Sequence, residues 1–321
     1  MSGTVSGRSG SGGADWPALG VRDGALLVVG DVVTDVIARH RGPLAAGTDT
    51  AAAIRTVPGG AGANAACWAA HRGRAEVRLL GRVGADAVAW HEQELIASGV
   101  TPCLVVDPEA PTGTVICLVD TGAAAERTFL TDSGASLLLE PGDWSDAFLD
   151  GVAWLHLSGY LLFSEPSRAL VRVALASARA RGVPVSLDPA SAGFLTELGV
   201  DRFLALVEGV DVLLPSRDEA CLLTGLPDVE DAAAKLSRHV PLVVAKQGSA
   251  GALVARAGAV STHVPAVPAT LRDTTGAGDA FTGAFLAALL YGAGPEEAAR
   301  AGCRAGASAV ERVGGRPPVS G

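Results

Sequence analysis

Aromatic residues are scarce in this chain, and clusters of basic residues and long apolar runs are absent from it. Phe, Trp and Tyr make up 4% of the 321 residues, and the net charge is −9. Because no cluster of Lys and Arg side chains stands out, the sequence predicts neither a nucleic acid nor an anionic membrane as a partner. No apolar run approaches the ~20 residues that a helix needs to span a membrane.

The cysteines are scattered, and none forms a C-x-x-C pair with another. The sequence therefore predicts neither a zinc site nor a disulfide framework. Cysteines of this kind are typical of reduced, buried thiols, and they indicate a cytoplasmic protein. The five are Cys67, Cys103, Cys117, Cys221 and Cys303.

Two common phosphate-binding motifs are also missing. No G-x-x-x-x-G-K-[ST] segment occurs, which excludes a P-loop. Residues 58–62 contain several glycines, but they lack the G-x-G-x-x-G spacing, and no clear apolar strand runs into them. An NAD(P)-dependent oxidoreductase would need that fingerprint, so this alternative rests only on the glycines and on the type of sheet.

Apolar residues, by contrast, are plentiful, at 49% of the chain. This is ample for a large buried core, and we expect one domain over residues 23–318. Residues 1–22 are rich in Gly and Ser and contain no apolar h-region, so we expect a flexible tail there rather than a signal peptide.

Buried strands and helices alternate along most of this domain. Apolar runs predict strands at residues 26–30, 77–81, 152–157, 183–188, 210–215, 242–246 and 252–255. Helical patterns occupy residues 86–98, 165–180, 196–207, 218–224, 229–239 and 295–312. The alternation predicts an α/β fold with a Rossmann-like, doubly wound, mostly parallel sheet flanked by helices. Ligands bind such sheets at the carboxyl ends of the strands.

Two segments rich in short β patterns interrupt the alternation. They cover about residues 38–57 and 100–131. Small β excursions of this kind predict a lid that covers one end of the main domain.

Residues 272–283 carry the strongest chemical signal. They read R-D-T-T-G-A-G-D-A-F-T-G, a polar turn with two glycines that runs into an apolar helix. A helix start presents unpaired N–H groups and the positive end of the dipole, which suits an anion. Asp279 would repel that anion unless it acts as the base that takes a proton from an attacking hydroxyl. Taken alone, the residues also fit an ordinary capped helix start.

Further polar side chains follow other predicted strands. Asp31 and Asp35 follow the strand at 26–30, with solvated turn residues as the alternative. Asp188 ends a strand, Glu219 lies in the first turn of a helix, and Lys246 opens a glycine-containing hairpin. Together, Asp188, Glu219 and Lys246 predict a ligand for a cation and a basic side chain that reaches phosphate, all at one face of the domain. Singly, a cap, a capping-box partner and a surface charge are the alternatives.

With these motifs the chain resembles the ribokinase-like (PfkB) carbohydrate kinases over about residues 25–318. The signatures D-T-T-G-A-G-D at 273–279 and P-G-G-x-G-x-N at 58–64 carry the resemblance. It implies a kinase that uses ATP and Mg²⁺ to phosphorylate a hydroxyl of a small sugar, with a nucleoside kinase of the same family as the alternative. Phosphoryl transfer depends on positioning and charge neutralisation, which a helix N-terminus and Mg²⁺ supply.

The resemblance also implies roles for individual residues. Asp279 would be the base, and the backbone N–H groups of Gly276, Ala277 and Gly278 would form the anion hole. Glu219 would organise Mg²⁺ through water. The implied substrate ligands are Asp35, Gly59, Gly60 and Asn64, and the implied nucleotide site comprises Ser216, Lys246, Gly248, Gly251, Thr275 and Ser308.

Two further assignments are open. Asp273, with backbone carbonyls near residues 309–314, would bind a monovalent cation such as K⁺ in members that have one. Arg127 in the second lid segment is a candidate substrate ligand, with a surface charge as the alternative. Exposed lid strands predict a homodimer.

The chain departs from the family pattern at four positions. Ser216 replaces the Asn of the family's N-x-x-E, which leaves open a non-catalytic, ligand-binding homologue. Ala61 and Ser158 replace a Lys and a Glu that are common in ribokinases, and Pro318 replaces a Ser of some K⁺-activated members. The acceptor therefore stays unnamed, although the few aromatic residues in the N-terminal half favour a sugar.

Overall fold

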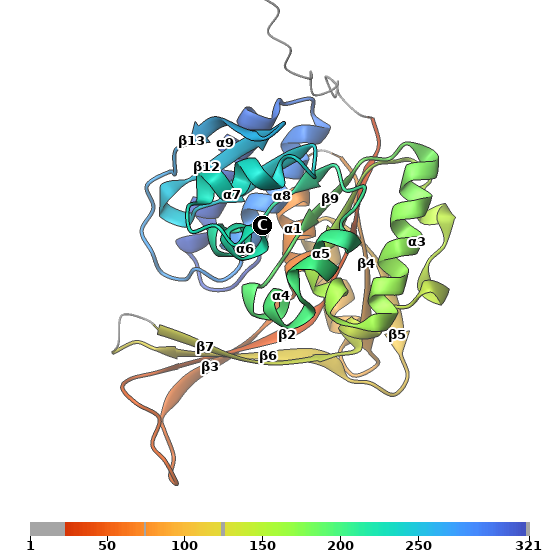
Figure 1. The fold of residues 1–321 in the computed structure, drawn as a ribbon. Helices are drawn as coiled ribbons and strands as arrows, with labels where there is room; N and C mark the ends of the chain where they lie inside the picture. Colours follow the sequence, from red (N-terminus) through yellow and green to blue (C-terminus); the bar gives the residue numbers. More distant parts are fainter. Residues whose placement is uncertain (1–22, 74, 123–125, 319–321) are drawn as a thin grey trace, which may run out of the picture.

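The computed structural model describes residues 23–73, 75–122 and 126–318, without the side chains of Glu126 and Arg127 (Figure 1). The predicted flexible tail at residues 1–22 lies outside the described residues. Within the described ranges the strands form two sheets. The larger has nine strands in the order β13-β12-β11-β10-β9-β8-β1-β4-β5, and the smaller has four in the order β3-β2-β6-β7.

The large sheet is the doubly wound, mostly parallel sheet that the sequence predicts. Its neighbouring strands run parallel from β5 to β11, and only the last two, β12 and β13, pair antiparallel. The strand β13 was not predicted. The strands are β1 (Ala25–Val29), β4 (Val77–Gly84), β5 (Val100–Asp107), β8 (Val152–Ser158), β9 (Val185–Asp188), β10 (Val212–Leu213), β11 (Leu242–Lys246), β12 (Ala252–Arg256) and β13 (Ala259–Val264).

Helices cover both faces of this sheet, because the central strands are apolar on both sides. Leu26 and Val28 of β1 join one buried cluster, while Leu27 and Val29 join another. The first cluster contains α1 (Ala61–Arg72), α2 (Val88–Ala97), α8 (Ala277–Leu290) and α9 (Pro295–Val310). The second contains α3 (Glu165–Arg181), α4 (Ala192–Leu198), α5 (Val200–Leu206), α6 (Arg217–Thr224) and α7 (Val229–Leu236).

The remaining helical features are short 3₁₀ turns and a break within one predicted helix. Residues 196–207 were predicted as one helix, but Gly199, with φ 88°, separates α4 from α5. The 3₁₀ turns of the described ranges are η1 (Ala135–Leu138), η2 (Pro141–Asp143), η3 (Asp146–Leu149), η4 (Gly159–Phe163) and η5 (Gly248–Ala250).

The order of the strands reverses between β1 and β8. From β1 the sheet grows through β4 to β5, and from β8 it grows in the other direction through β9. Ligands bind doubly wound sheets in the crevice at such a switch point, beyond the carboxyl ends of the strands. Asp31 follows β1, and Ser158, the last residue of β8, donates a hydrogen bond from its Oγ to Oδ1 of Asp31 at 2.7 Å.

The four-stranded sheet, called here the lid sheet, projects beyond that edge (Figure 1). It consists of β2 (Val33–His40), β3 (Ala52–Gly59), β6 (Thr112–Asp120) and β7 (Glu126–Gly134). The predicted lid boundaries need correction. Residues 100–107 form β5 of the large sheet, because α2 returns the chain to pair β5 parallel with β4 from Val77↔Val100 to Gly84↔Asp107. The first lid segment also begins earlier, at Val33, since β2 follows β1 almost directly.

Candidate active site

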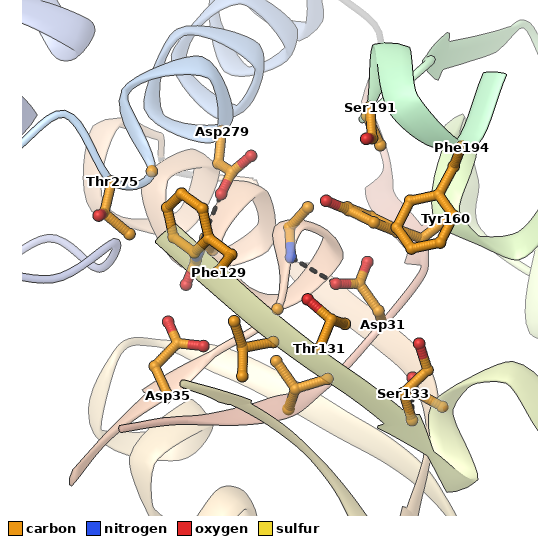
Figure 2. A pocket seen from close by; sticks show the side chains of 18 of the residues that line it. Asp31, Asp35, Phe129, Thr131, Ser133, Tyr160, Ser191, Phe194, Thr275 and Asp279 are labelled. Carbon is orange, nitrogen blue, oxygen red and sulfur yellow. Dashed lines mark hydrogen bonds between the residues drawn. The ribbon is translucent and has the colours of Figure 1, made fainter. Parts of the chain in front are cut away.

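The two glycine-rich signatures meet where α1 and α8 begin. Asn64 and Asp279 lie in the first turns of these helices, and Nδ2 of Asn64 donates a hydrogen bond to Oδ2 of Asp279 at 2.9 Å (Figure 2). Small residues allow the helices to pack closely, since a Cβ at Gly283 would overlap the carbonyl oxygen of Ala65. Two residues 215 positions apart are thereby in contact.

The N-terminus of α8 faces the cleft. Gly276 caps the helix in the left-handed region, with φ 72° and ψ 4°, and a Cβ there would overlap Cα of Gly315. This position therefore requires glycine for both its backbone angles and its lack of a side chain. Thr275, Gly276 and Asp279 line the cleft, so the positive end of the dipole points into it. The N–H of Ala277 donates a 3.3 Å hydrogen bond to the carbonyl of Thr274.

Asp279 has the electrostatics of a base that works near neutral pH. Burial raises the pKa of its carboxyl to about 7, although the hydrogen bond from Asn64 opposes the shift. Asp188 and Asp31 raise the pKa of Asp279 further, while Lys246 lowers it. A general base is most effective when its pKa is close to the working pH.

The predicted substrate ligands gather at the base of the lid sheet. Asp35 points from β2 against Gly59, where a Cβ would overlap the carboxylate. Gly60 has φ 97°, and a Cβ on it would overlap the carbonyl of Asp31. Asp35, Gly60 and Asn64 line the cleft. Burial, and next the negative charge of Asp31, raise the pKa of Asp35 to about 7.

Asp31 holds the start of α1 in place, a role that the sequence did not indicate. Its Oδ2 accepts from the N–H of Ala61 at 2.6 Å, and its Oδ1 accepts from that of Gly62 at 3.1 Å. The carboxylate thus caps the start of α1, while Ser158 fixes it from β8. Asp31 is therefore a structural anchor at the switch point.

A buried charge cluster lies at the ends of β9 and β11. Lys246 forms an ion pair with Oδ2 of Asp188, and the hydroxyl of Thr282 donates to the same oxygen at 2.7 Å. Burial alone would lower the pKa of Lys246, but Asp188 and Glu219 raise it. A Cβ placed on Gly278 would lie 3.6 Å from Nζ of Lys246. A surface charge was one interpretation of Lys246, but the lysine is a partly buried cation beside the start of α8.

Ser216 and Glu219 form a capping box at the start of α6. The N–H of Ser216 donates to Oε2 of Glu219 at 2.7 Å, and Oγ of Ser216 accepts from the N–H of Glu219 at 3.3 Å. Glu219 is buried, and burial raises its pKa although Lys246 opposes the shift. Serine can close this capping box, so the replacement of the family's Asn leaves the helix start intact.

The cleft has a volume of about 1230 Å³ and is lined by residues from both sheets. Several of them were not predicted. In β7, alternate residues face the cleft, as the period of two in a strand requires. Aromatic rings approach from the opposite wall, where Tyr160 and Phe194 lie 5.9 Å apart between ring centres (Figure 2). The unpredicted residues include Phe129, Thr131, Ser133, Ser136, Tyr160, Ser191 and Phe194.

Other predicted residues are not part of this lining. Gly248 and Gly251 lie in the hairpin between β11 and β12, and Ser308 lies on α9. Lys246, Ser216 and Glu219 are not among the lining residues either. Arg127 belongs to β7, but its side chain lies outside the described part of the structure.

Asp273 ties the signature loop to the end of the chain. Its Oδ1 accepts from the N–H of Thr275 at 2.8 Å, and its Oδ2 accepts from that of Gly314 at 3.0 Å. The carbonyl of Val310 accepts from the N–H groups of Arg272 and Asp273. The carboxylate of Asp273 and the carbonyl of Val310, which lie in the region assigned to a monovalent cation, therefore already accept hydrogen bonds from backbone N–H groups.

The carboxylates near the cleft suit Mg²⁺ in one particular way. No three or more His, Cys, Asp or Glu side chains of the described residues form a group that could hold a metal ion. Mg²⁺ commonly keeps several waters and binds through one or two carboxylates plus substrate phosphates. Glu219 and Asp188 fit that mode, because Glu219 is a buried acid, Asp188 a partly buried one, and the charge of Lys246 acts on both.

In the described ranges, no helix combines the length and the apolar character that crossing a membrane would demand.

Comparison with known proteins agrees with this geometry. Residues 24–320 match the family described as pfkB family carbohydrate kinase. The chain is 33% identical over 277 residues to a fructokinase of Klebsiella pneumoniae, which covers 83% of this chain and 85% of the relative. It is 31% identical over 316 residues to a ribokinase of Arabidopsis thaliana, with 92% and 78% covered.

A solved structure gives the same fold. An Escherichia coli protein classed as ribokinase II, in complex with ATP and Mg²⁺, superposes with a TM-score of 0.80 at 26% identity, covering 93% of this chain and 96% of that one. The predicted ribokinase-like fold is thereby confirmed. This chain belongs to the pfkB family of carbohydrate kinases, phosphotransferases with an alcohol group as acceptor.

Proposed function

We propose that this kinase transfers the γ-phosphoryl group of ATP to a hydroxyl of a small sugar, with Asp279 as the base. The observation that carries the proposal is the contact between Asn64 of the substrate signature and Asp279 at the α8 N-terminus. A hydroxyl held by the first signature would then lie beside both a carboxylate and an anion-binding helix end. The N–H groups of Gly276, Ala277 and Gly278 would stabilise charge on the transferring group.

The acceptor would be held from the lid side. Asp35 accepts hydrogen bonds when ionised, and Asn64 offers a donor and an acceptor. Oδ1 of Asn64 is buried and has no hydrogen-bond partner. This orphaned acceptor is what a substrate hydroxyl would satisfy. Gly59 and Gly60 allow the close approach, and Arg127 remains a proposed ligand.

ATP would lie along the ends of β10 and β11. Lys246 and Thr275 would contact its phosphates, and the other proposed nucleotide contacts are Ser216, Gly248, Gly251 and Ser308. Glu219 would hold Mg²⁺ through water, and Mg²⁺ neutralises phosphate charge in such reactions. K⁺ at Asp273 is a separate proposal, tested by activity with and without K⁺.

The test is ADP formation from ATP with ribose, fructose, 2-keto-3-deoxygluconate, adenosine and pseudouridine. We expect turnover with a sugar, and a loss of roughly 10²–10⁴ in kcat in Asp279→Asn. A variant with comparable kcat would refute the assignment of the base. Nucleotide binding by calorimetry without turnover of any acceptor would instead support the non-catalytic homologue.

A nucleoside acceptor is the second candidate, and the cleft contains an observation that favours it. Phe129 of the lid sheet, 52% exposed, faces the rings of Tyr160 and Phe194 across the cleft (Figure 2). Aromatic side chains on two walls could enclose a base by stacking. Phe129→Ala should lower kcat/KM for adenosine about tenfold and leave that for fructose nearly unchanged if nucleosides are the acceptors.

Dimerisation through the lid sheet and a cytoplasmic location complete the proposal. The outer strand β3 is exposed from Ala52 to Thr56, which offers an edge for pairing with a second copy. Sedimentation of the protein would test the dimer.

A further inference from the structure

Tyr160 lines the cleft, but the proposed reaction gives its hydroxyl no role. The residue is the second of η4, which begins directly after β8 at the switch point of the large sheet. Asp31 and Asp279 line the same cleft. The phenol therefore shares its space with the proposed base and with whatever acceptor binds there.

Packing against two phenylalanines fixes the ring of Tyr160. Its centre lies 5.9 Å from the ring centre of Phe163 and 5.9 Å from that of Phe194, and the planes are steeply inclined, at 81° and 75°. Phe163 and Phe194 stack on each other with 4.9 Å between centres and 26° between planes. Edge-to-face and offset-stacked pairs are the arrangements that aromatic rings favour. The direction of the phenol is thus set before a substrate binds, which lowers the entropic cost of binding.

The backbone at Tyr160 is also held closely. A Cβ on Gly159 would lie 2.4 Å from the carbonyl oxygen of Asp188, so η4 starts in direct contact with the loop that follows β9. In that loop Ala190, which also lines the cleft, has φ 76°, a left-handed angle that is uncommon for a residue other than glycine. Strained backbone of this kind gathers at sites that bind ligands.

The hydroxyl of Tyr160 points into the cleft (Figure 2). It forms no hydrogen bond with any residue that the structure describes. Burial, and after it the negative charges of Asp31 and Asp279, raise the pKa of the phenol. The hydroxyl therefore stays protonated around neutral pH and can donate a hydrogen bond.

The side chains proposed to bind the acceptor are mostly hydrogen-bond acceptors themselves. The carboxylates of Asp35 and Asp279 only accept when they are ionised. Nδ2 of Asn64 already donates to Asp279, and Oδ1 of Asn64 can only accept. A sugar also has oxygens that need a donor, such as its ring oxygen, which carries no proton. A fixed phenol without a partner supplies that donor.

We propose that Tyr160 is a substrate-binding residue: its hydroxyl donates a hydrogen bond to a sugar oxygen of the acceptor other than the hydroxyl that is phosphorylated. The inference rests on the proposed function, in which this cleft holds a sugar or the ribose of a nucleoside. The bond would add to specificity, because a site built to hydrogen-bond a substrate group discriminates against analogues that lack it.

The kinetics of Tyr160→Phe test the proposal, because this change removes the hydroxyl and keeps the ring. The probes are ribose, fructose, 2-keto-3-deoxygluconate, adenosine and pseudouridine. For the probe that the parent phosphorylates best, we expect the KM to rise about fivefold and kcat to stay within about twofold. The KM for ATP should not change. An unchanged KM for the acceptor, or an equal rise in the KM for ATP, overturns the proposal.

Tyr291→Phe is the matched control, because it removes the hydroxyl of the chain's other tyrosine, which does not line the cleft. Its KM values and kcat should equal those of the parent. Tyr291 accepts a hydrogen bond from the N–H of Ala75 at 2.5 Å, so this variant should melt below the parent. Tyr160→Phe should melt with the parent, since its hydroxyl has no partner to lose. A lower melting temperature together with a loss of kcat in Tyr160→Phe would show a structural role instead.

Analogues of the best acceptor that each lack one oxygen identify the contact. For one of them, the parent and Tyr160→Phe should have the same KM, because the oxygen that Tyr160 contacts is missing. If every analogue keeps the fivefold difference, Tyr160 contacts none of these oxygens and the proposal fails. A parent that phosphorylates no probe contradicts the proposed function and this inference with it. An active parent whose KM is insensitive to Tyr160→Phe contradicts the role of Tyr160 alone.

Discussion

The side-chain amide of Asn64, the chain's only asparagine, donates a hydrogen bond to the carboxylate of Asp279 at 2.9 Å. This bond lowers the pKa of Asp279, against the larger effect of burial. Asn64, a proposed acceptor ligand, therefore also affects the pH at which Asp279, the proposed base, is ionised.

Asn64→Ala should shift the acidic limb of kcat to higher pH. Without the amide, burial and the nearby acids act on Asp279 unopposed by this bond, and its pKa rises above about 7. We expect kcat to fall about tenfold at pH 7 and to recover partly at pH 9. In the Asp279→Asn background the same change should have little further effect, and an equal loss in both backgrounds would contradict the coupling.

The pH dependence of kcat/KM should be unusually steep. Asp35 and Asp279 both have a pKa raised to about 7, and in their proposed roles both would have to be ionised. Activity is therefore present above pH 7 and lost as the pH falls through that value. A plot of log kcat/KM against pH should approach a slope of two on the acidic side, and Asp35→Asn should reduce it to one. A slope of one in the parent would show that only one carboxylate matters.

Lys246→Met should lower kcat by about 10²-fold, because the ammonium lies beside the α8 N-terminus, where the phosphoryl group would be transferred. It should also lower the free energy of unfolding by roughly 3–5 kcal/mol, since the buried Glu219 and the partly buried Asp188 would be left without a cation. Lys235→Met is the control, because it removes the chain's other lysine from an exposed position on α7. Urea unfolding and steady-state kinetics measure the two effects.

Gly283→Ala should destabilise the protein and disturb the site together. The added methyl group meets the carbonyl of Ala65 and Cβ of Trp68, so α1 and α8 must separate. We expect a loss of about 1–3 kcal/mol in the free energy of unfolding, with reduced kcat as Asn64 moves from Asp279. In Gly193→Ala in α4 the new methyl group would meet Oγ of Ser191 at 3.7 Å, an ordinary contact, so the change should be neutral or slightly stabilising. Equal effects of both changes would argue against the packing explanation.

Local pattern was enough to predict the architecture and the centre of the site. Apolar runs located most strands of the large sheet, and the signatures located Asn64 and Asp279. Local pattern failed to predict which of the two sheets a short strand joins. Residues 100–107 pair with β4 only because α2 brings them there, and no property of their own sequence distinguishes them from the strands of the lid sheet.

For the same reason, local pattern could not predict contacts between residues that lie far apart in the sequence. Asp31 caps a helix that begins thirty positions later along the chain, and Ser158 reaches it from β8. The rings of Tyr160 and Phe194 lie close together although the two residues are far apart in the sequence. A count of aromatic residues could not predict this arrangement. Alternation in β7 was the one usable signal, since Phe129, Thr131 and Ser133 share a face.

The contacts of Gly314 with Asp273 and of Gly315 with Gly276 have a consequence for synthesis of the protein. The nascent chain can form β1, α1 and the lid sheet early. Asp273 and Gly276, which lie just before α8, gain their contacts to Gly314 and Gly315 only when these later residues have left the ribosome. A chain translated only as far as α9 would therefore lack these contacts at the proposed transfer centre. Catalytic competence should appear only after Gly314 and Gly315 have been translated.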